Sequence, residues 1–318
     1  MAQLTQRAPA SARRSPVRGR RPGRARLGGY WFYLIPSAVL FLAVIVVPFL
    51  MNIGVSFTRW TGVGTPRWTG LDNYRRLFTD ENFWSSFQNN VLLIVAMAII
   101  PTVIGLVLAA ALFDYIGKRF GPRTASALRA AYYLPQVLPV AVAGVVWGWM
   151  LHPSYGALNE ILKAVGLDSL AENWLGDPDF ALATVMAIMV WFQLGYPVVI
   201  FMAGLQRVDP SLYEAAEIDG ATWWRRFWHI TVPQIRPETY VVLLTCTIAA
   251  LKVFAPIFVL TRGGPGKATM VPSYFSYQNF FEKANVGYGS AIATILAIII
   301  VVVTFFFLRI QERDKESP

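Results

Sequence analysis

Charge is scarce in this chain. Of its 318 residues only 14% are charged, whereas a soluble protein has about 25%, and 55% are hydrophobic. This composition argues against a soluble globular protein and indicates a chain that lies largely in a membrane.

Residues that usually carry chemistry are few as well. Cysteine occurs once, at Cys246, which excludes an intrachain disulfide. The two histidines, His152 and His229, belong to no cluster with metal-ligand spacing. The sequence has no Gly-x4-Gly-Lys-Ser/Thr nucleotide loop and no Ser-His-Asp arrangement. We therefore expect no catalysis, no metal and no cofactor on this chain.

Six apolar runs are long enough to cross a hydrocarbon core, which takes about 20 residues. They are approximately Tyr30–Gly54, Val91–Phe113, Tyr132–Leu151, Phe180–Leu205, Tyr240–Leu260 and Tyr288–Leu308. Prolines inside several runs are tolerable in lipid, because neighbouring helices satisfy the freed carbonyls. Buried core helices are the alternative, but six such runs in one chain argue against it. We expect an all-α polytopic membrane protein with six transmembrane helices.

Lysine and arginine are distributed unevenly between the two sets of flanking segments. Nineteen lie in the N-terminal tail and the second, fourth and last polar segments, and Lys252 falls within a span. Eight lie in the opposite loops: Arg59, Arg67, Arg75, Arg76, Lys163, Arg262, Lys267 and Lys283. Because cytoplasmic loops carry the excess of positive charge, we expect both termini to be cytoplasmic. The same rule explains the net charge of +10 without a nucleic-acid partner.

The polar regions are short compared with the spans. Residues 1–29 are rich in Arg, Pro, Ala and Ser, which predicts a disordered basic cytoplasmic tail. The apolar run that follows is too long for a signal-peptide core, so we expect it to remain as the first span. Residues 30–310 then form the six-helix domain, and 311–318 a cytoplasmic C-terminal tail. The outward loops, about 55–90, 152–179 and 261–287, are too small for an independent catalytic domain.

Each outward loop has a recognisable pattern. The first holds an amphipathic segment from Gly70 to Phe78, which we expect at the membrane interface. The second has a predicted helix, Leu158–Val165, that ends at Gly166. The third is rich in glycine and aromatic residues. It either docks a partner or caps a pore, or its aromatic residues anchor helix ends at the interface.

The cytoplasmic segment of about 206–237 is polar but compatible with a helix. Asp209-Pro210-Ser211 begins a helix, and Pro233 ends its second part. Small residues (Ala215, Ala216, Ala221) allow another backbone to come close, and large aromatic residues (Trp223, Trp224, Phe227, Trp228) supply anchors. A helix–glycine–helix of this kind suits a knob inserted into the cleft of a partner. An amphipathic hairpin at the membrane interface is the alternative.

The same segment resembles the signature loop of permease subunits in binding-protein-dependent ABC importers. That signature is Glu-Ala-Ala, three residues, Gly, nine residues, Ile, one residue, Leu-Pro. The chain has Glu214-Ala215-Ala216, Gly220, Ile230 and Pro233 in register, and departs from it only at Val232. The resemblance implies the type I importer permease fold. It also implies that Glu214, Ala215, Ala216 and Gly220 lie in a coupling loop that fits a groove of a cytoplasmic ATPase.

Further stretches are similar to the maltose-type sugar permeases, and the resemblance covers roughly residues 30–310. They include Gly70-Leu71-Asp72-Asn73-Tyr74, Tyr133-Leu134-Pro135, Gly195-Tyr196-Pro197 and Gly263-Gly264-Pro265. This resemblance implies a sugar, a di- or oligosaccharide, as the cargo. Polyol, glycerol-phosphate and amino-acid import stay open in the same superfamily. A stand-alone transporter or membrane enzyme is more remote, because the spans lack clustered carboxylates and histidines.

The resemblance also implies the partners and the cycle. The partners are a second similar permease, an ATPase dimer that binds ATP and Mg²⁺, and a solute-binding protein outside a bacterial cytoplasmic (inner) membrane. Membrane lipid surrounds the spans. When ATP closes the motor, the coupling loops move with it and the permeases rock between inward- and outward-facing states.

Candidate residues for the sugar path lie in the fourth and fifth spans. Sugar recognition needs aromatic faces and hydrogen-bonding groups, and polar residues at membrane depth usually face a cavity or the bundle interior. The candidates are Trp191, Gln193, Tyr196 and Lys252. Lys252 either donates to sugar hydroxyls or reaches toward the outer interface along its apolar stem. The partner permease is the alternative holder of the sugar.

Overall fold

A computed structural model describes residues 30–316, so the predicted tail of residues 1–29 lies outside the described part. The chain divides into two compact units, Met1–Leu50 and Met51–Pro318. Helix α1 (Tyr30–Phe41) leads through a π-helical turn, Leu42–Val46, into helix α2 (Val47–Ser56), in which the first unit ends. This stretch is apolar and exposed, as expected of a helix that faces lipid.

The second unit is almost entirely helical. After a two-stranded antiparallel ribbon, β1 (Thr58–Arg59) and β2 (Arg67–Trp68), the chain forms α3 (Asp72–Thr79) and α4 (Glu81–Ile94). Helix α3 confirms the predicted amphipathic segment. Next come a π-helical turn (Val95–Ile99), α5 (Ile100–Ala110), the π-helical turn η3 (Ala111–Ile116), α6 (Gly117–Phe120), α7 (Pro122–Val137), α8 (Val140–Met150) and α9 (Ala157–Ala164).

The remaining elements complete this unit. They are α10 (Pro178–Gln193), α11 (Gly195–Leu205), α12 (Pro210–Ile218), α13 (Trp223–Arg226), the π-helical turn η5 (Phe227–Thr231), α14 (Val232–Gln234), α15 (Arg236–Leu251), α16 (Ala255–Leu260), α17 (Pro272–Tyr277), a π-helical turn (Gln278–Glu282) and α18 (Val286–Glu316). Helix α18 extends to Glu316, so the described part of the predicted C-terminal tail is helical.

Four helices of the described chain are long and apolar enough to cross a membrane, and five if one bent pair counts as a span. The four are Phe32–Ser56, Glu81–Tyr115, Pro178–Leu205 and Val286–Arg313. They coincide with the first, second, fourth and sixth predicted runs. The all-α membrane architecture is therefore confirmed, but the other two predicted runs are not single helices.

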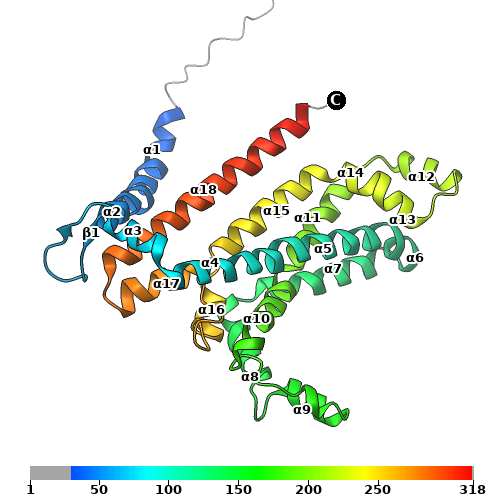
Figure 1. The fold of residues 1–318 in the computed structure, drawn as a ribbon. Helices are drawn as coiled ribbons and strands as arrows, with labels where there is room; N and C mark the ends of the chain where they lie inside the picture. The colour runs from blue at the N-terminus through cyan, green and yellow to red at the C-terminus, as the bar shows by residue number, and fades with distance from the viewer. Residues whose placement is uncertain (1–29, 317–318) are drawn as a thin grey trace, which may run out of the picture. The chain divides into compact units, whose positions relative to one another are not determined.

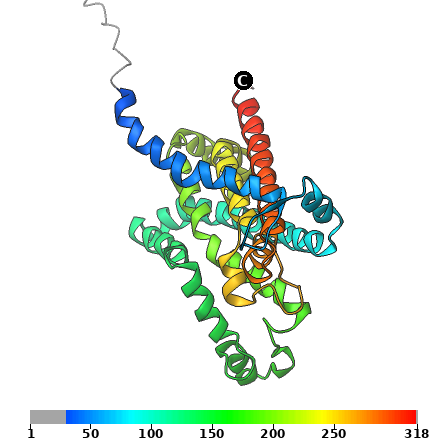
Figure 2. The same cartoon turned by 90° about the vertical axis from the view of Figure 1, so that its left-hand side faces the viewer.

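The third predicted run, Tyr132–Leu151, contains a sharp bend. Helices α7 and α8 meet at an angle of 94° across Leu138 and Pro139 (Figure 2). Leu138 is extended because the ring of the following proline disfavours a helical conformation before it. Pro139 itself lacks the amide that would continue the helix.

The fifth predicted run, Tyr240–Leu260, is also interrupted. Helix α15 ends at Leu251, and α16 begins only at Ala255. Lys252 therefore lies exposed at the C-terminal end of a helix and not within a continuous span. Pro256, in the first turn of α16, is well placed to begin a helix and poorly placed to continue one.

Within the second unit, α4 and α5 form one long helix beside α15, and α11 packs against both α5 and α7 (Figure 1). Two groups of buried residues hold these helices together. One lies around Leu93, Val185 and Tyr274, where α4, α10, α17 and α18 meet, and the other around Phe201 and Cys246, between α11 and α15. The segment α12–α14 lies at one end of the long helix, and α3 lies near the other (Figure 1).

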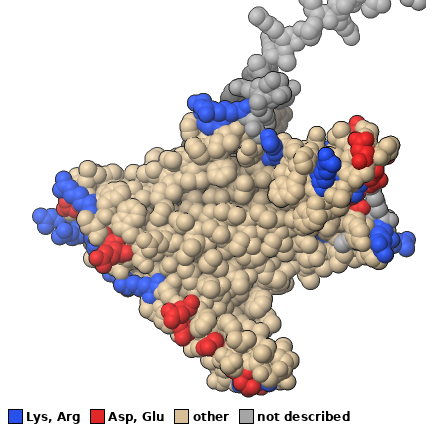
Figure 3. All heavy atoms as spheres, turned by 45° about the vertical axis from the view of Figure 1, so that its right-hand side comes forward, with Lys and Arg blue, Asp and Glu red and all other residues tan. Residues whose placement is uncertain are grey.

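Charged side chains on the face shown in Figure 3 lie toward its edges, and a broad uncharged surface lies between them. Many large apolar side chains of the described chain are exposed, among them Val103, Val142, Val145 and Phe305. Water would penalise such a surface, whereas the hydrocarbon of a bilayer does not. The exposed apolar side chains are therefore suited to contact with lipid.

Candidate functional site

The predicted coupling loop forms a short exposed helix, α12. Asp209 begins it by accepting a hydrogen bond from the Ser211 amide at 2.9 Å, and Pro210 occupies the first helical turn. This backbone bond and the Ser211 hydroxyl lower the pKa of Asp209 below its usual value of 3.8. The cap is therefore fully ionised at neutral pH and is lost only when the pH falls through that lowered value.

Glu214 and Ala215 lie exposed on this helix, and Ala216 is half-buried. Next to them Ile218 is 87% exposed. The helix thus presents small and apolar side chains together with one carboxylate. Such a surface fits the cleft of another protein.

Gly220 ends the helix in a left-handed conformation, with φ of 70°. The Ala221 amide donates to the Ala216 carbonyl at 2.9 Å and the Gly220 amide to the Glu217 carbonyl at 3.1 Å, which is the Schellman arrangement. A Cβ at Gly220 would meet nothing within 4 Å. The positive φ alone, and no lack of space, therefore accounts for glycine at this position.

After Gly220 the chain returns along a second helical piece, α13 with η5. Trp223 stacks on the buried ring of Phe227, with ring centroids 5.3 Å apart. Trp224 and Trp228 instead lie exposed. The four predicted anchors therefore divide into two that fix the loop internally and two that can contact a membrane or a partner.

A buried tyrosine attaches α12 to this returning segment. The Tyr213 hydroxyl lies 3.0 Å from the Thr231 hydroxyl, and both side chains are buried. The Tyr213 ring also lies near that of Phe113 in η3, with centroids 6.5 Å apart. The loop is thereby connected to the end of the long helix that begins at α4.

Arg226 connects the loop to η3 through ion pairs. Its guanidinium lies 3.1 Å from the Asp114 carboxylate in η3 and also pairs with Glu217 in α12. The side chains of Arg226 and Asp114 are only 12% and 10% exposed. A buried pair of this kind is costly to break, because one charge is then left without its partner. Three segments of the chain therefore meet at one arginine.

Only a weak signal of this cluster is visible in the sequence. Asp114 is an ionisable residue at the end of an apolar run, where such a residue often has a specific partner. Arg226 is one of the nineteen Lys and Arg residues that the orientation rule assigns to cytoplasmic segments, and that rule predicts no partner for it. Their separation of 112 residues hid the pair, since no local spacing connects them.

A second ion pair closes the base of the loop. Arg207, just after α11, pairs with Glu238 in the first turn of α15.

Beside α12, a pocket of about 360 Å³ is lined by Ala216, Asp219, Ala221, Arg225, Arg226, His229 and Ile230. His229 therefore borders the coupling loop. Among the described residues, no group of three His, Cys, Asp or Glu side chains is placed to hold a metal ion.

The four predicted path residues do not converge. Trp191 is partly exposed on α10 and packs edge-to-face on Trp147 of α8, with centroids 5.4 Å apart. Gln193 is buried, and its amide donates to the Cys246 sulfur at 3.2 Å. Tyr196 packs beside the buried group around Phe201. Within the described chain, no hydrogen bond or ring contact joins any two of Trp191, Gln193, Tyr196 and Lys252.

The architecture and the loop define a multi-pass membrane subunit with an exposed helix at one end. Residues 102–317 match the family described as binding-protein-dependent transport system inner membrane component. That match covers more than half of the chain, and the chain belongs to this family.

Several relatives support this assignment. The probable ABC transporter permease YurN of Bacillus subtilis is 34% identical over 90% of this chain and 97% of its own length. The sulfoquinovosyl glycerol permease SmoG of Agrobacterium fabrum is 32% identical, over 87% of this chain and 88% of its own. The trehalose/maltose permease MalF of Thermococcus litoralis is 34% identical, over 76% and 78%.

The fold agrees with a solved structure of an ABC importer. A chain of the bacterial alginate ABC transporter, in complex with an alginate pentasaccharide-bound periplasmic protein, superimposes with a TM-score of 0.77 at 23% identity. The match covers 90% of this chain and 95% of that chain. The type I importer permease fold is therefore confirmed. The cytoplasmic placement of both termini stays a prediction.

Proposed function

We propose that this chain is the membrane-spanning subunit of an ATP-driven importer and is driven by a separate ATPase through Glu214–Gly220. The observation that carries the proposal is the exposed helix α12, ended by Gly220 and fixed to the long helix through Arg226. Glu214 offers a charge to a cationic group of the ATPase, while Ala215 and Ala216 allow its backbone to approach. ATP and Mg²⁺ belong to that partner, and this chain catalyses no reaction.

The contacts of the loop supply a route for movement. Arg226 links α12 to η3 at the end of the helix Glu81–Tyr115, and Arg207 links α11 to α15 through Glu238. A displacement of α12 by the ATPase is thus passed to membrane-spanning helices by ion pairs and buried aromatic contacts. Rigid-body motion of packed helices between two states is a known form of such switching.

The remaining partners follow from the family. We assign to this chain a second, similar permease and a solute-binding protein outside the membrane. The alginate importer is described as a complex with a periplasmic protein, which supports the second of these partners.

For the cargo, we propose a sugar, and a di- or oligosaccharide in particular. Relatives of this chain are named for trehalose/maltose, diacetylchitobiose and sulfoquinovosyl glycerol. A glycerol-3-phosphate permease of Agrobacterium fabrum is also 34% identical, so glycerol-phosphate is the second candidate. Trp191, which packs edge-to-face on Trp147, is the path residue best placed to offer an aromatic face to a sugar ring.

Transport by the reconstituted complex tests both parts of this proposal. The chain is purified with the subunits that accompany it and placed in liposomes with ATP inside and the loaded binding protein outside. Ala216→Trp is expected to abolish uptake, because the indole prevents the ATPase from approaching α12 closely. The binding protein should then no longer stimulate ATP hydrolysis. Ile161→Trp is the matched control, since Ile161 is also exposed on a short helix, α9, away from the loop.

The outcomes separate coupling from cargo. Normal uptake by Ala216→Trp would overturn the coupling role, whatever the substrate is. Calorimetric titration of the binding protein with maltose-type oligosaccharides and with glycerol-3-phosphate identifies the cargo. Binding of only the phosphate ester would overturn the sugar assignment and leave the coupling role intact.

A further inference from the structure

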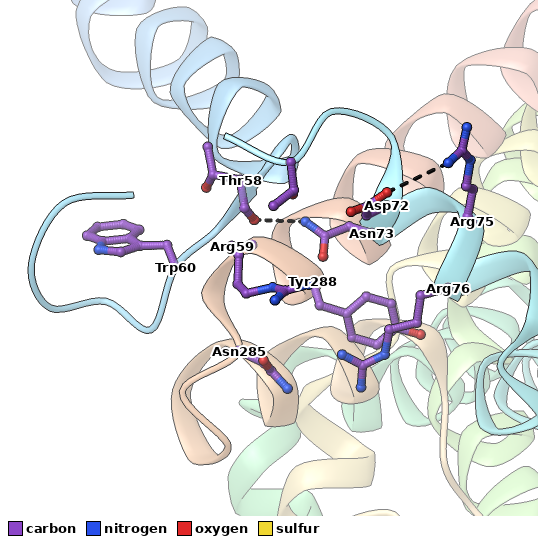
Figure 4. Close-up of a pocket in the computed structure, with 11 residues that line it drawn as sticks. Thr58, Arg59, Trp60, Asp72, Asn73, Arg75, Arg76, Asn285 and Tyr288 are labelled. Carbon is purple, nitrogen blue, oxygen red and sulfur yellow. Dashed lines mark hydrogen bonds and ion pairs between the residues drawn. The ribbon is translucent and has the colours of Figure 1, made fainter. Parts of the chain in front are cut away.

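A polar pocket of about 330 Å³ lies at the opposite end of the second unit from α12. Its lining includes Arg59, Trp60, Arg76, Asn285 and Tyr288. Figure 4 shows Arg59, Arg76 and Asn285 directed toward the space beside Tyr288 from three separate segments. None of the coupling or path residues contributes to this lining.

Close backbone packing builds the pocket. A Cβ on Gly287 would lie 1.8 Å from the Thr58 carbonyl oxygen, so only glycine lets β1 pass this close to the start of α18. The Asn73 amide donates to the carbonyls of Ser56 and Thr58 at 2.8 Å each, which fixes α3 against the same strand. The side chains of the pocket are therefore held on a defined framework.

The pocket has more positive than negative charge available. Its carboxylate, Asp72, lies 3.8 Å from Arg75, and nearby Asp80 accepts a hydrogen bond from the Tyr288 hydroxyl at 2.7 Å. The guanidinium of Arg76 lies 4.0 Å from the centre of the Tyr288 ring, an arrangement that orients the cation and leaves its N–H groups available. Within residues 30–316, neither Arg59 nor Arg76 forms an ion pair.

The pocket also lies where two apolar spans end. Thr58 and Arg59 follow the candidate span Phe32–Ser56, and Tyr288 lies in the first turn of the span Val286–Arg313. Ends of apolar spans are where lipid headgroups meet the protein, together with Trp and Tyr side chains. This side of the membrane is predicted to be poor in positive charge, yet Arg59, Arg67, Arg75 and Arg76 all lie in one loop.

We propose that this pocket binds the phosphate of an anionic phospholipid headgroup, with Arg59 and Arg76 as its ligands. The planar guanidinium matches a phosphate with paired N–H donors, and the Asn285 amide adds a further donor. The headgroup would connect β1, α3 and the start of α18. Each of these arginines is expected to strengthen binding roughly fivefold.

Lipid retention tests the proposal. The full-length chain, purified in detergent with its accompanying subunits and stripped of lipid, is titrated with phosphatidylglycerol or phosphatidylcholine and examined by native mass spectrometry. The natural sequence is expected to retain phosphatidylglycerol selectively. The double variant Arg59→Gln with Arg76→Gln should bind it about 25-fold more weakly. The corresponding lysine double variant should bind with intermediate affinity, because it keeps the charge and loses the paired N–H donors.

Arg67→Gln is the matched control, because Arg67 is an exposed arginine of the same ribbon that does not line the pocket. Equal retention of phosphatidylglycerol by the natural chain and the glutamine double variant would overturn the proposal. Full displacement of the lipid by millimolar inorganic phosphate would also overturn it and assign the pocket to a free anion. Unchanged lipid retention with weaker affinity for the binding protein would show that the pocket instead receives an acidic surface of that protein.

Discussion

At the scale of single residues, Arg226 and Gly220 determine how the loop around α12 is attached and shaped. Arg226 satisfies carboxylates from two segments, and Gly220 permits the turn that shapes the loop. Neither residue forms a site by itself. Each determines where an exposed helix lies relative to helices in the membrane.

Arg226→Gln is expected to destabilise the coupling end of the protein. Removal of the guanidinium leaves Asp114 nearly buried without this cation, which costs about 3 kcal/mol. Thermal unfolding of the purified complex should show the loss, and ATP-dependent uptake should fall with it. The double variant Asp114→Asn with Arg226→Gln should recover part of the stability, because the nearly buried side chain that faced Arg226 is then neutral. Additive losses in the double variant would show that the two side chains act independently.

Gly220→Ala is expected to loosen the end of α12 without any clash. The left-handed backbone costs a residue with a Cβ about 1 kcal/mol, which corresponds to roughly fivefold faster opening. Hydrogen exchange at the Ala221 amide, which donates to the Ala216 carbonyl, measures this directly. Gly220→Asn is the control, because asparagine tolerates the same conformation better. An unchanged exchange rate in the alanine variant would contradict this account of Gly220.

At the scale of helices, the two interrupted spans show how local chemistry alters a simple pattern. Hydrophobicity located both runs, but Pro139 bends one and the segment around Lys252 breaks the other. Broken helices at membrane depth are tolerated where protein or a water-filled cavity surrounds them. The break at Lys252 thus separates α15 from α16 within one apolar run.

Gln193 connects two of these helices. Its amide donates to Cys246, so α10 and α15 are joined at a buried point. We expect Gln193→Leu to leave the apparent affinity for transported substrate unchanged and to lower stability by about 0.6 kcal/mol, the typical value for a hydrogen bond between membrane helices. Cys246→Ala removes the acceptor and serves as the comparison. A large rise in KM for Gln193→Leu alone would place its side chain in the substrate path instead.

At the scale of the whole molecule, orientation in the membrane is the main prediction that awaits measurement. The chain has a single cysteine, which is buried, so Cys246→Ser gives a background for labelling with membrane-impermeant thiol reagents. Ile218→Cys on α12 should react only from the cytoplasmic side, and Ile161→Cys on α9 only from the outside. Both residues are exposed. Reaction of the two cysteines from the same side would contradict the predicted topology.

Much of the fold could be predicted because membrane insertion is governed by local composition. An apolar run of about 20 residues satisfies its own backbone only as a helix, so four predicted runs coincide with continuous helices. The local geometry of the segment from Asp209 to Gly220 could also be predicted, since its cap, its small residues and its glycine act over a single turn. Helix α12 begins after Asp209 and ends before Gly220, in agreement with these local signals.

Contacts between distant segments were decided only by the tertiary structure. The pair Asp114–Arg226 joins residues 112 positions apart, and the pocket around Tyr288 combines segments that begin at Thr58 and end near Asn285. The pairing of Gln193 with Cys246 likewise depends on which helices pack together. The sequence by itself determined the spans and the signature loop, because their causes are local. Which charged side chains lie together was determined only by the packing of the helices. That packing depends on all the helices together and cannot be inferred from any one segment.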